Sequence, residues 1–330
     1  MSSIRSSRLP RSSDVVVDRG AAWPWRVLCP ECLARARVEA AALVCDANMH
    51  RISIERDVLP LLPRERVTAL EPFLSSYRRV RHAEGWGGDA LYYLGLPFED
   101  RSRRHEDIWK LRARTFRAAL RSIERRFGRE PLRVLELGAG NCWCAARLSA
   151  RGHRVLATDV HLDGEDGLGA LDVYRDRLEH VPDRARAEMT RLPLDAEQFD
   201  LVVANGAFHY AADMSQAARE AYRVLRAAGV LLVLDSPVYP SREDGEAMVK
   251  ERALEHERLY RVVAASDTDS GFLVETEFAR LLVDAGFEVE VERPFAGFNR
   301  ALRRVWTRAR GLRPPAGFPV WTAIKHESRS

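Results

Sequence analysis

The second half of the chain alternates short apolar runs with longer segments of helical spacing. Short apolar runs of strand length predict strands at 133–137, 154–159, 199–204 and 230–235, and the segments 287–292 and 320–325 can supply the closing strands. Apolar residues at helical spacing predict helices at 141–151, 215–225 and 276–285, which Gly152, Gly229 and Gly286 follow as turn or end signals. Strands that alternate with helices form a mostly parallel sheet covered on both faces, so the pattern predicts an α/β domain over residues 131–330.

The first 130 residues follow a different pattern. Residues 1–22 are polar and predict a flexible tail. Residues 23–63 contain three cysteines and end in the apolar run Val58–Leu62, which indicates a small separate unit. Residues 64–130 are rich in arginine and have helical spacing. We interpret this third segment as a helical lid or linker in front of the α/β domain.

Composition disfavours a dedicated nucleic-acid binder, a membrane protein and a disulfide-rich secreted protein. The chain has 330 residues, 46% of them hydrophobic, and a formal net charge of +4, which is modest for a dedicated nucleic-acid binder. No apolar run approaches the length of a membrane span, so we expect no membrane partner. Five cysteines in a chain of this length do not make a disulfide framework. A reducing, cytoplasmic location is therefore expected.

The first predicted strand of the α/β domain runs into a glycine-rich turn. Gly138 and Gly140 allow a sharp turn and a close approach to a ligand, and the next helix begins with free N–H groups. Asp159 ends the second predicted strand, 19 residues after Gly140, where a carboxylate can accept both hydroxyls of a ribose. A dinucleotide-binding turn needs a small residue at the position of Trp143, so binding of NAD is disfavoured.

These residues belong to an ordered series of motifs that resembles the class I S-adenosylmethionine-dependent methyltransferases. The series includes Glu136-x-Gly138-x-Gly140, Asp159, and the segments 188–194, 199–203, 205–210 and 222–229. The last segment departs from the family pattern, because Ala227 and Ala228 replace a proline and a glycine. The resemblance covers residues 131–240 well and is specific for fold and cofactor, but not for the substrate.

The resemblance implies a Rossmann-like, seven-stranded sheet and a set of cofactor contacts. Gly138 and Gly140 would pass beneath the methionine part of S-adenosylmethionine, and Glu136 would hold its amino group. The ribose hydroxyls would bind to Asp159. The remaining implied contacts are to the adenine and to the floor near the sulfonium, made by Glu188, Met189 and Asn205.

Residues near the predicted acceptor mouth supply candidates for a general base. His209 and Tyr210 follow the strand 199–204, and Asp235 ends the strand 230–235. A phenol, carboxylic acid or carbon acid must lose a proton to accept a methyl group, and an unperturbed histidine titrates near neutral pH. His209 is the first candidate base, with Tyr210 and Asp235 next. The alternative is that His209 and Tyr210 only shape the pocket.

The N-terminal cysteines have the spacing of metal ligands. Cys29 and Cys32 form a CxxC pair, and Cys45 and His50 follow. Thiolates and an imidazole suit tetrahedral zinc, which would stabilise a unit with little core. The unit resembles zinc ribbons with two CxxC knuckles, but Asn48 stands where the fourth cysteine would be, so His50 would have to replace it. A degenerate ribbon without metal is the alternative.

Three functions remain open at this stage. The first is methylation of an oxygen, nitrogen or carbon atom of a small-molecule acceptor, in secondary metabolism. The second is a ribosomal RNA methyltransferase whose ribbon holds the RNA. The third is a non-catalytic protein that binds the cofactor. The intact acidic and glycine positions disfavour the third, and the modest net charge disfavours the second.

Overall fold

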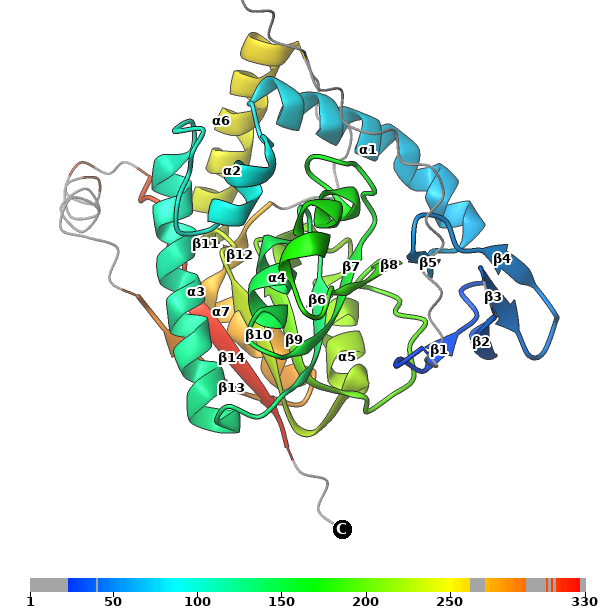
Figure 1. The fold of residues 1–330 in the computed structure, drawn as a ribbon. Helices are drawn as coiled ribbons and strands as arrows, with labels where there is room; N and C mark the ends of the chain where they lie inside the picture. The colour runs from blue at the N-terminus through cyan, green and yellow to red at the C-terminus, as the bar shows by residue number, and fades with distance from the viewer. Residues whose placement is uncertain are drawn as a thin grey trace, which may run out of the picture.

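A computed structural model describes residues 23–39, 41–261, 271–294, 307, 310 and 313–326 (Figure 1). The predicted tail over residues 1–22 lies outside the described residues. Within the described residues, no helix combines the length and the apolar character that crossing a membrane requires.

An eight-stranded sheet forms the centre of the molecule, in the order β13-β14-β10-β9-β6-β7-β8-β5. Pairing is parallel from β5 through β10 and antiparallel where β14 joins β10 and β13. The order reverses at β6, which lies between β9 and β7, so a ligand site is expected at the carboxyl ends of these three strands. The strands are β5 (Val58–Pro60), β6 (Arg133–Leu137), β7 (Arg154–Asp159), β8 (Asp183–Arg186), β9 (Phe199–Asn205), β10 (Leu225–Leu234), β13 (Phe287–Glu292) and β14 (Val320–Lys325).

Helices cover both faces of this sheet, as the continuous apolar strands require. One buried cluster joins Leu135, Val202 and Leu231 to α5 (Met214–Val224) and α7 (Glu275–Asp284). The other joins alternate residues of the same strands to α3 and α4 on the opposite face. The other helices are α1 (Arg64–Ala83), α2 (Ala90–Gly95), α3 (Glu106–Phe127), α4 (Trp143–Ser149) and α6 (Arg242–Tyr260), with short turns of 3-10 helix at η1 (Leu168–Arg177) and η2 (Phe208–Tyr210).

A separate antiparallel sheet, which we call the ribbon, contains β1 (Val27–Leu28), β2 (Arg35–Glu39), β3 (Ala42–Cys45) and β4 (Arg51–Ser53). It packs against the large sheet: the Leu28 N–H donates to the Pro193 carbonyl at 2.9 Å, and the ring of Trp25 stacks on Phe199 at 5.1 Å. A third, minor sheet pairs β11 (Val238–Tyr239) with β12 (Leu273–Val274).

The structure confirms the α/β fold with a mostly parallel sheet and adds one strand to the seven that were predicted. β5 comes from the apolar run that was assigned to the cysteine unit, yet it pairs with β8 at the edge of the large sheet. The residues after Pro60 continue this integration, since Leu61 is fully buried in the cluster that also holds Leu135. The ribbon and the large sheet therefore share a core.

Two local predictions need correction. The helix predicted over 141–151 begins at Trp143, because Cys142 has a left-handed backbone (φ 62°). Gly229 was predicted to close a turn, but it lies inside β10, where the register with β9 shifts between Leu225 and Val230. The left-handed residue at this irregularity is Ala228 (φ 59°), which stands where the family pattern has glycine.

Candidate cofactor and active site

A cavity lies at the carboxyl ends of β6, β7 and β9, where the strand order reverses. The cavity wall includes every residue that was predicted to contact the cofactor: Glu136, Gly138, Gly140, Asp159, Glu188, Met189 and Asn205. Residues of α1 and α3 also line the wall, namely Leu70, Phe73, Leu74, Tyr77, Arg81 and Arg112. The ends of the strands thus supply the polar floor, and α1 supplies an apolar and aromatic cover.

The turn after β6 needs glycine for steric reasons. Gly138 has φ 65°, and a Cβ at this position would lie 2.4 Å from the Cβ of Ala207. Gly140 also has a left-handed backbone, and its N–H donates to Asp159 Oδ2 at 2.8 Å. The turn therefore keeps the floor of the cavity open and fixes the carboxylate of the neighbouring strand.

Asp159 is held by two backbone donors. Its Oδ1 accepts from the His161 N–H at 2.8 Å, and its Oδ2 accepts from Gly140. Burial raises the pKa of this carboxyl, and the two N–H groups oppose that rise. An ionised carboxylate oxygen has further lone pairs, so both oxygens can still accept hydrogen bonds from a ligand.

Two buried side-chain oxygen atoms in the same cavity accept no hydrogen bond from the described residues. Glu136 is 1% exposed, and its Oε2 has no hydrogen-bond partner in the described part of the chain. Asn205 Oδ1 is likewise buried and unpartnered there. Burial raises the pKa of Glu136 to about 8. Buried polar atoms are normally satisfied, so this end of the cavity is suited to a ligand that brings hydrogen-bond donors or a positive charge.

Glu188 has a partner that the sequence did not indicate. Its two carboxylate oxygens accept from Arg66 of α1 at 2.7 and 3.0 Å, and its side chain is 17% exposed. Met189 lies beside the glycine turn, since its Cε would be 3.7 Å from a Cβ on Gly138. Glu188, one of the two residues predicted to contact adenine, is thus tied to the helix that covers the cavity.

Several cavity residues on α1 and α3 were missed at the sequence level. Leu70, Phe73, Leu74 and Tyr77 have the spacing of one helical face, so a signal was present, but it could not show which surface the face would cover. Arg81 pairs with Asp166 and lies 3.9 Å from the ring centre of Trp86. The guanidinium of Arg112 lies 4.7 Å from the ring centre of Trp109, and no described residue accepts a hydrogen bond from its side chain.

Of the three candidate bases, only Tyr210 lines the cavity, and its side chain is 37% exposed. His209 is buried beneath it, with Nδ1 3.0 Å from Ser236 Oγ, and burial lowers its pKa to about 3. Asp235 is also buried, accepts from Thr115 Oγ1 at 2.6 Å, and has a pKa raised by burial. The base assignment stays a prediction, but the geometry favours Tyr210 over His209 as the residue that faces an acceptor.

The four residues predicted to bind metal do come together. The ligand atoms of Cys29, Cys32, Cys45 and His50 all lie within 4.8 Å of one another. Cys29 Sγ is 3.6 Å from His50 Nδ1, and Cys32 Sγ is 3.6 Å from Cys45 Sγ. Tetrahedral zinc with bonds of about 2.3 Å to sulfur requires sulfur atoms about 3.7 Å apart. The donor set and its spacing therefore fit zinc, and Asn48 contributes only its N–H, which donates to Cys45 Sγ at 3.5 Å.

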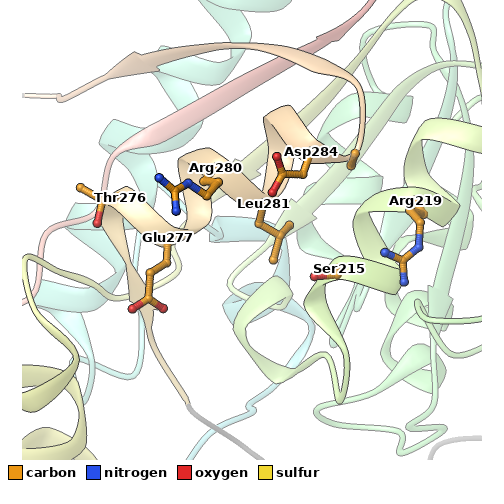
Figure 2. A pocket seen from close by; sticks show the side chains of 8 residues that line it. Ser215, Arg219, Thr276, Glu277, Arg280, Leu281 and Asp284 are labelled. Carbon is orange, nitrogen blue, oxygen red and sulfur yellow. The ribbon is translucent and has the colours of Figure 1, made fainter.

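A second hollow lies apart from this chemistry, between α5 and α7 (Figure 2). Its polar wall carries two arginines and two acidic residues and shares no residue with the cavity described above. The residues that line it are Ser215, Arg219, Thr276, Glu277, Arg280, Leu281, Asp284 and Ala285.

Comparison with solved structures finds chains of similar fold at low sequence identity. The cyclase SpnF is 18% identical, with a TM-score of 0.50 over 82% of this chain and 98% of its own. A Haloferax volcanii complex of the Trm112 methyltransferase activator with a methyltransferase matches with 17% identity and a TM-score of 0.46, over 68% of this chain and 95% of the other. An arsenic(III) methyltransferase from Chlamydomonas reinhardtii is 22% identical, with a TM-score of 0.41 over 66% and 74%.

Comparison of sequences is more limited in extent. None of the curated proteins matches this chain. Residues 135–233 match the family model described as a methyltransferase domain, which spans the segment from β6 to β10 and so contains the glycine turn, Asp159, Glu188 and Asn205. The chain accordingly carries a class I S-adenosylmethionine-dependent methyltransferase domain and is a methyltransferase.

Proposed function

We propose that this protein transfers a methyl group from S-adenosylmethionine to a small-molecule acceptor in the cytoplasm. The observation that carries the proposal is the buried, unpartnered Oε2 of Glu136 in a cavity that also contains the glycine turn and Asp159. When bound, S-adenosylmethionine supplies a methyl group on a positively charged sulfur. The residues of the cavity would bind this cofactor and orient the acceptor against it.

Separate groups of cavity residues match separate parts of the cofactor. Glu136 and Asn205 would accept hydrogen bonds from the ammonium group, and Asp159 would accept from the ribose hydroxyls. Arg112, which lines the same cavity and donates to no described residue, would bind the carboxylate. Glu188 would accept from the adenine amine through the lone pairs that Arg66 leaves unused, with Met189 against the adenine ring.

The cover formed by α1 supports a small acceptor over RNA. Leu70, Phe73 and Tyr77 close the cavity with apolar and aromatic surface, which suits a compact ligand that is largely enclosed. A folded RNA would instead require an open basic surface. We therefore assign residues 64–130 as the lid and 131–330 as the methyltransferase domain, and we place the acceptor near Tyr210. A role in secondary metabolism is part of the same proposal.

We further propose that the ribbon binds one structural zinc ion through Cys29, Cys32, Cys45 and His50. All four positions of a tetrahedral site are then filled by protein ligands, which is typical of structural zinc. The cluster lies in the ribbon and contributes no residue to the cavity wall, so the metal would stabilise the fold and take no part in the reaction.

Two measurements test the function. Calorimetry with S-adenosylhomocysteine should show binding, and NAD should show none. Incubation with labelled S-adenosylmethionine should transfer label to a small-molecule extract and not to ribosomal RNA. Transfer to RNA would favour the second candidate. Binding without transfer to any acceptor would favour a non-methylating role, which the fold permits, since a neighbour of similar fold is described as a cyclase.

A further inference from the structure

The loop between Cys29 and Cys32 contacts the first residue of α1 and Arg191 in the turn after β8, and these two elements carry Arg66 and Glu188. We infer that Glu31, which lies in this loop, is a positioning residue for cofactor binding, because it fixes α1 and the turn that carries Glu188 relative to one another. This inference rests on the proposed function, since it concerns the affinity of the same cavity for S-adenosylmethionine.

The first contact is at the start of α1. Pro63 precedes the helix and provides no side-chain cap, so the N–H groups of the first turn need acceptors from elsewhere. Glu31 Oε1 accepts from the Arg64 N–H at 3.1 Å. A carboxylate at a helix N-terminus is favourable for both hydrogen bonding and the helix dipole. The ribbon thus supplies the cap that α1 lacks.

The second contact is with the turn that follows β8. Arg191 donates from its side chain to the Glu31 carbonyl at 3.5 Å, and from its backbone N–H to the Glu188 carbonyl at 3.2 Å. Glu188 is in turn held by Arg66, one turn or less from the capped end of α1. Glu31, the start of α1, Glu188 and Arg191 therefore form a closed ring of contacts.

Glu31, the member of this ring that belongs to the ribbon, lies in the loop between Cys29 and Cys32, two of the predicted metal ligands. The loop is closed by the Cys29 N–H, which donates to the Ala34 carbonyl, and by the Leu33 N–H, which donates to the Cys29 carbonyl, each at 2.8 Å. From its capped end α1 extends toward α6 (Figure 1), and Leu70, Phe73 and Tyr77 along it line the cavity. Loss of the cap would loosen the end of α1 that bears Arg66 and so the cover formed by Leu70, Phe73 and Tyr77.

Calorimetric titration of the full chain with S-adenosylhomocysteine tests the inference. Glu31→Ala should raise the dissociation constant by about threefold to tenfold, the range that loss of a helix cap supports. Glu31→Gln should bind nearly as well as the wild type, since its amide oxygen still accepts from Arg64. Asp46→Ala is the matched control: Asp46 follows Cys45 in the other loop, is exposed, and pairs with Arg37 inside the ribbon.

A second pair of variants tests the same contact from the other side and leaves the cysteine loop untouched. Arg64→Pro removes the donating N–H at a helix position that accepts proline, and Arg64→Ala keeps it. Weaker binding in Arg64→Pro but not in Arg64→Ala is expected, and this pair decides if Glu31→Ala does not fold. Equal affinities within both pairs would overturn the inference alone. Absence of binding by the wild type would overturn the proposed function and this inference together.

Discussion

The ribbon and the large sheet hold their functional groups in opposite ways. In the large sheet, apolar clusters on both faces fix the strands, and the polar cavity residues lie beyond the strand ends. In the ribbon, the four side chains that we propose as zinc ligands lie together, and among the ribbon strands only β3 is buried along its whole length. We therefore expect function and stability to be separable in the sheet. In the ribbon we expect the proposed zinc ligands to add to the stability that residues such as Val27 and Leu43 gain from the shared core.

Removal of one thiolate is the strongest test of this difference. Cys32→Ser should eliminate the bound zinc, which in small metal-dependent units contributes about 10–16 kcal/mol of binding free energy. Elemental analysis should show the loss of metal. Hydrogen exchange should show lost protection in β1 to β4, while β6, β9 and β10 stay protected. Cys142→Ser, at a buried cysteine outside the cluster, should keep the metal. Full retention of zinc by Cys32→Ser would refute the site.

The sheet should behave in the opposite way when a site residue is changed. Glu136→Gln removes the charge proposed to bind the cofactor ammonium, so affinity for S-adenosylhomocysteine should fall roughly tenfold to 100-fold. The Tm of the ligand-free protein should not fall, because Glu136 Oε2 has no hydrogen bond to lose in the described structure. A large drop in Tm would show that the cofactor site and the stability of the sheet are coupled after all.

The raised pKa of Glu136 should make the affinity of the cavity for S-adenosylhomocysteine depend on pH. Its pKa is raised to about 8, so in the free protein the carboxyl is protonated below that pH. Because only the ionised form attracts an ammonium, affinity for S-adenosylhomocysteine should rise with pH up to about 8, by as much as about tenfold per unit. The ligand amine also titrates, so the ratio of wild type to Glu136→Gln isolates the protein group. A ratio that does not change with pH would contradict the assignment.

Substitutions of Tyr210, which lines the cavity, and of the buried His209 should have smaller effects, and these effects should differ. Tyr210→Phe should lower kcat/KM for the acceptor about tenfold through a lost hydrogen bond, with cofactor affinity unchanged. His209→Gln should cost less than the roughly 100-fold expected for loss of a general base. Since the pKa of His209 is lowered to about 3, the wild-type rate should show no histidine inflection between pH 5 and pH 8. A loss of 100-fold or more in His209→Gln would restore it as the base.

The smallest expected effect lies inside the sheet itself. Ala228 has a left-handed backbone at the irregularity in β10, and such a conformation costs a non-glycine residue about 1–2 kcal/mol. Ala228→Gly should raise the free energy of unfolding by about 0.5–1 kcal/mol, after the entropy cost of glycine is subtracted. Chemical denaturation measures this change. The ribbon should show no response, and a change in its metal content would contradict the separation of the two regions.

Strand positions were predictable wherever a run of apolar residues was bounded by turn residues. β6, β7, β13 and β14 have the predicted ends, and each ends at a polar residue or a turn. β6, β7 and β14 are mostly buried, whereas β13, at the edge of the sheet, is buried only at Phe287. β8 was not located, because its sequence, Asp183-Arg-Ala-Arg186, is mostly polar. Its Arg184 is nevertheless buried, with its guanidinium donating to the Arg56 and Leu168 carbonyls. A buried arginine that satisfies backbone carbonyls gives no signal of burial in the sequence.

Only the part of the candidate site that lies at the strand ends was predictable from the sequence. The glycine turn and the acids near it occupy fixed positions on consecutive strands, so local motifs identify them. The Arg66–Glu188 pair joins positions 122 residues apart, and Arg112 enters from a helix whose direction no local pattern reveals. The burial that lowers the pKa of His209 is likewise a product of packing. Contacts made by the lid thus depend on the tertiary fold.

β5, the strand that the large sheet has beyond the predicted seven, also affects the order in which the protein can fold during synthesis. β5 pairs with β8 through positions such as Val58 and Arg184, which are 126 residues apart. During synthesis, β5 and the apolar residues after it leave the ribosome well before their partner strand exists. Leu59 and Leu61, fully buried in the finished protein, must then stay exposed until residue 186 has emerged. The N-terminal segment therefore completes its fold only after β6, β7 and β8 have been synthesised.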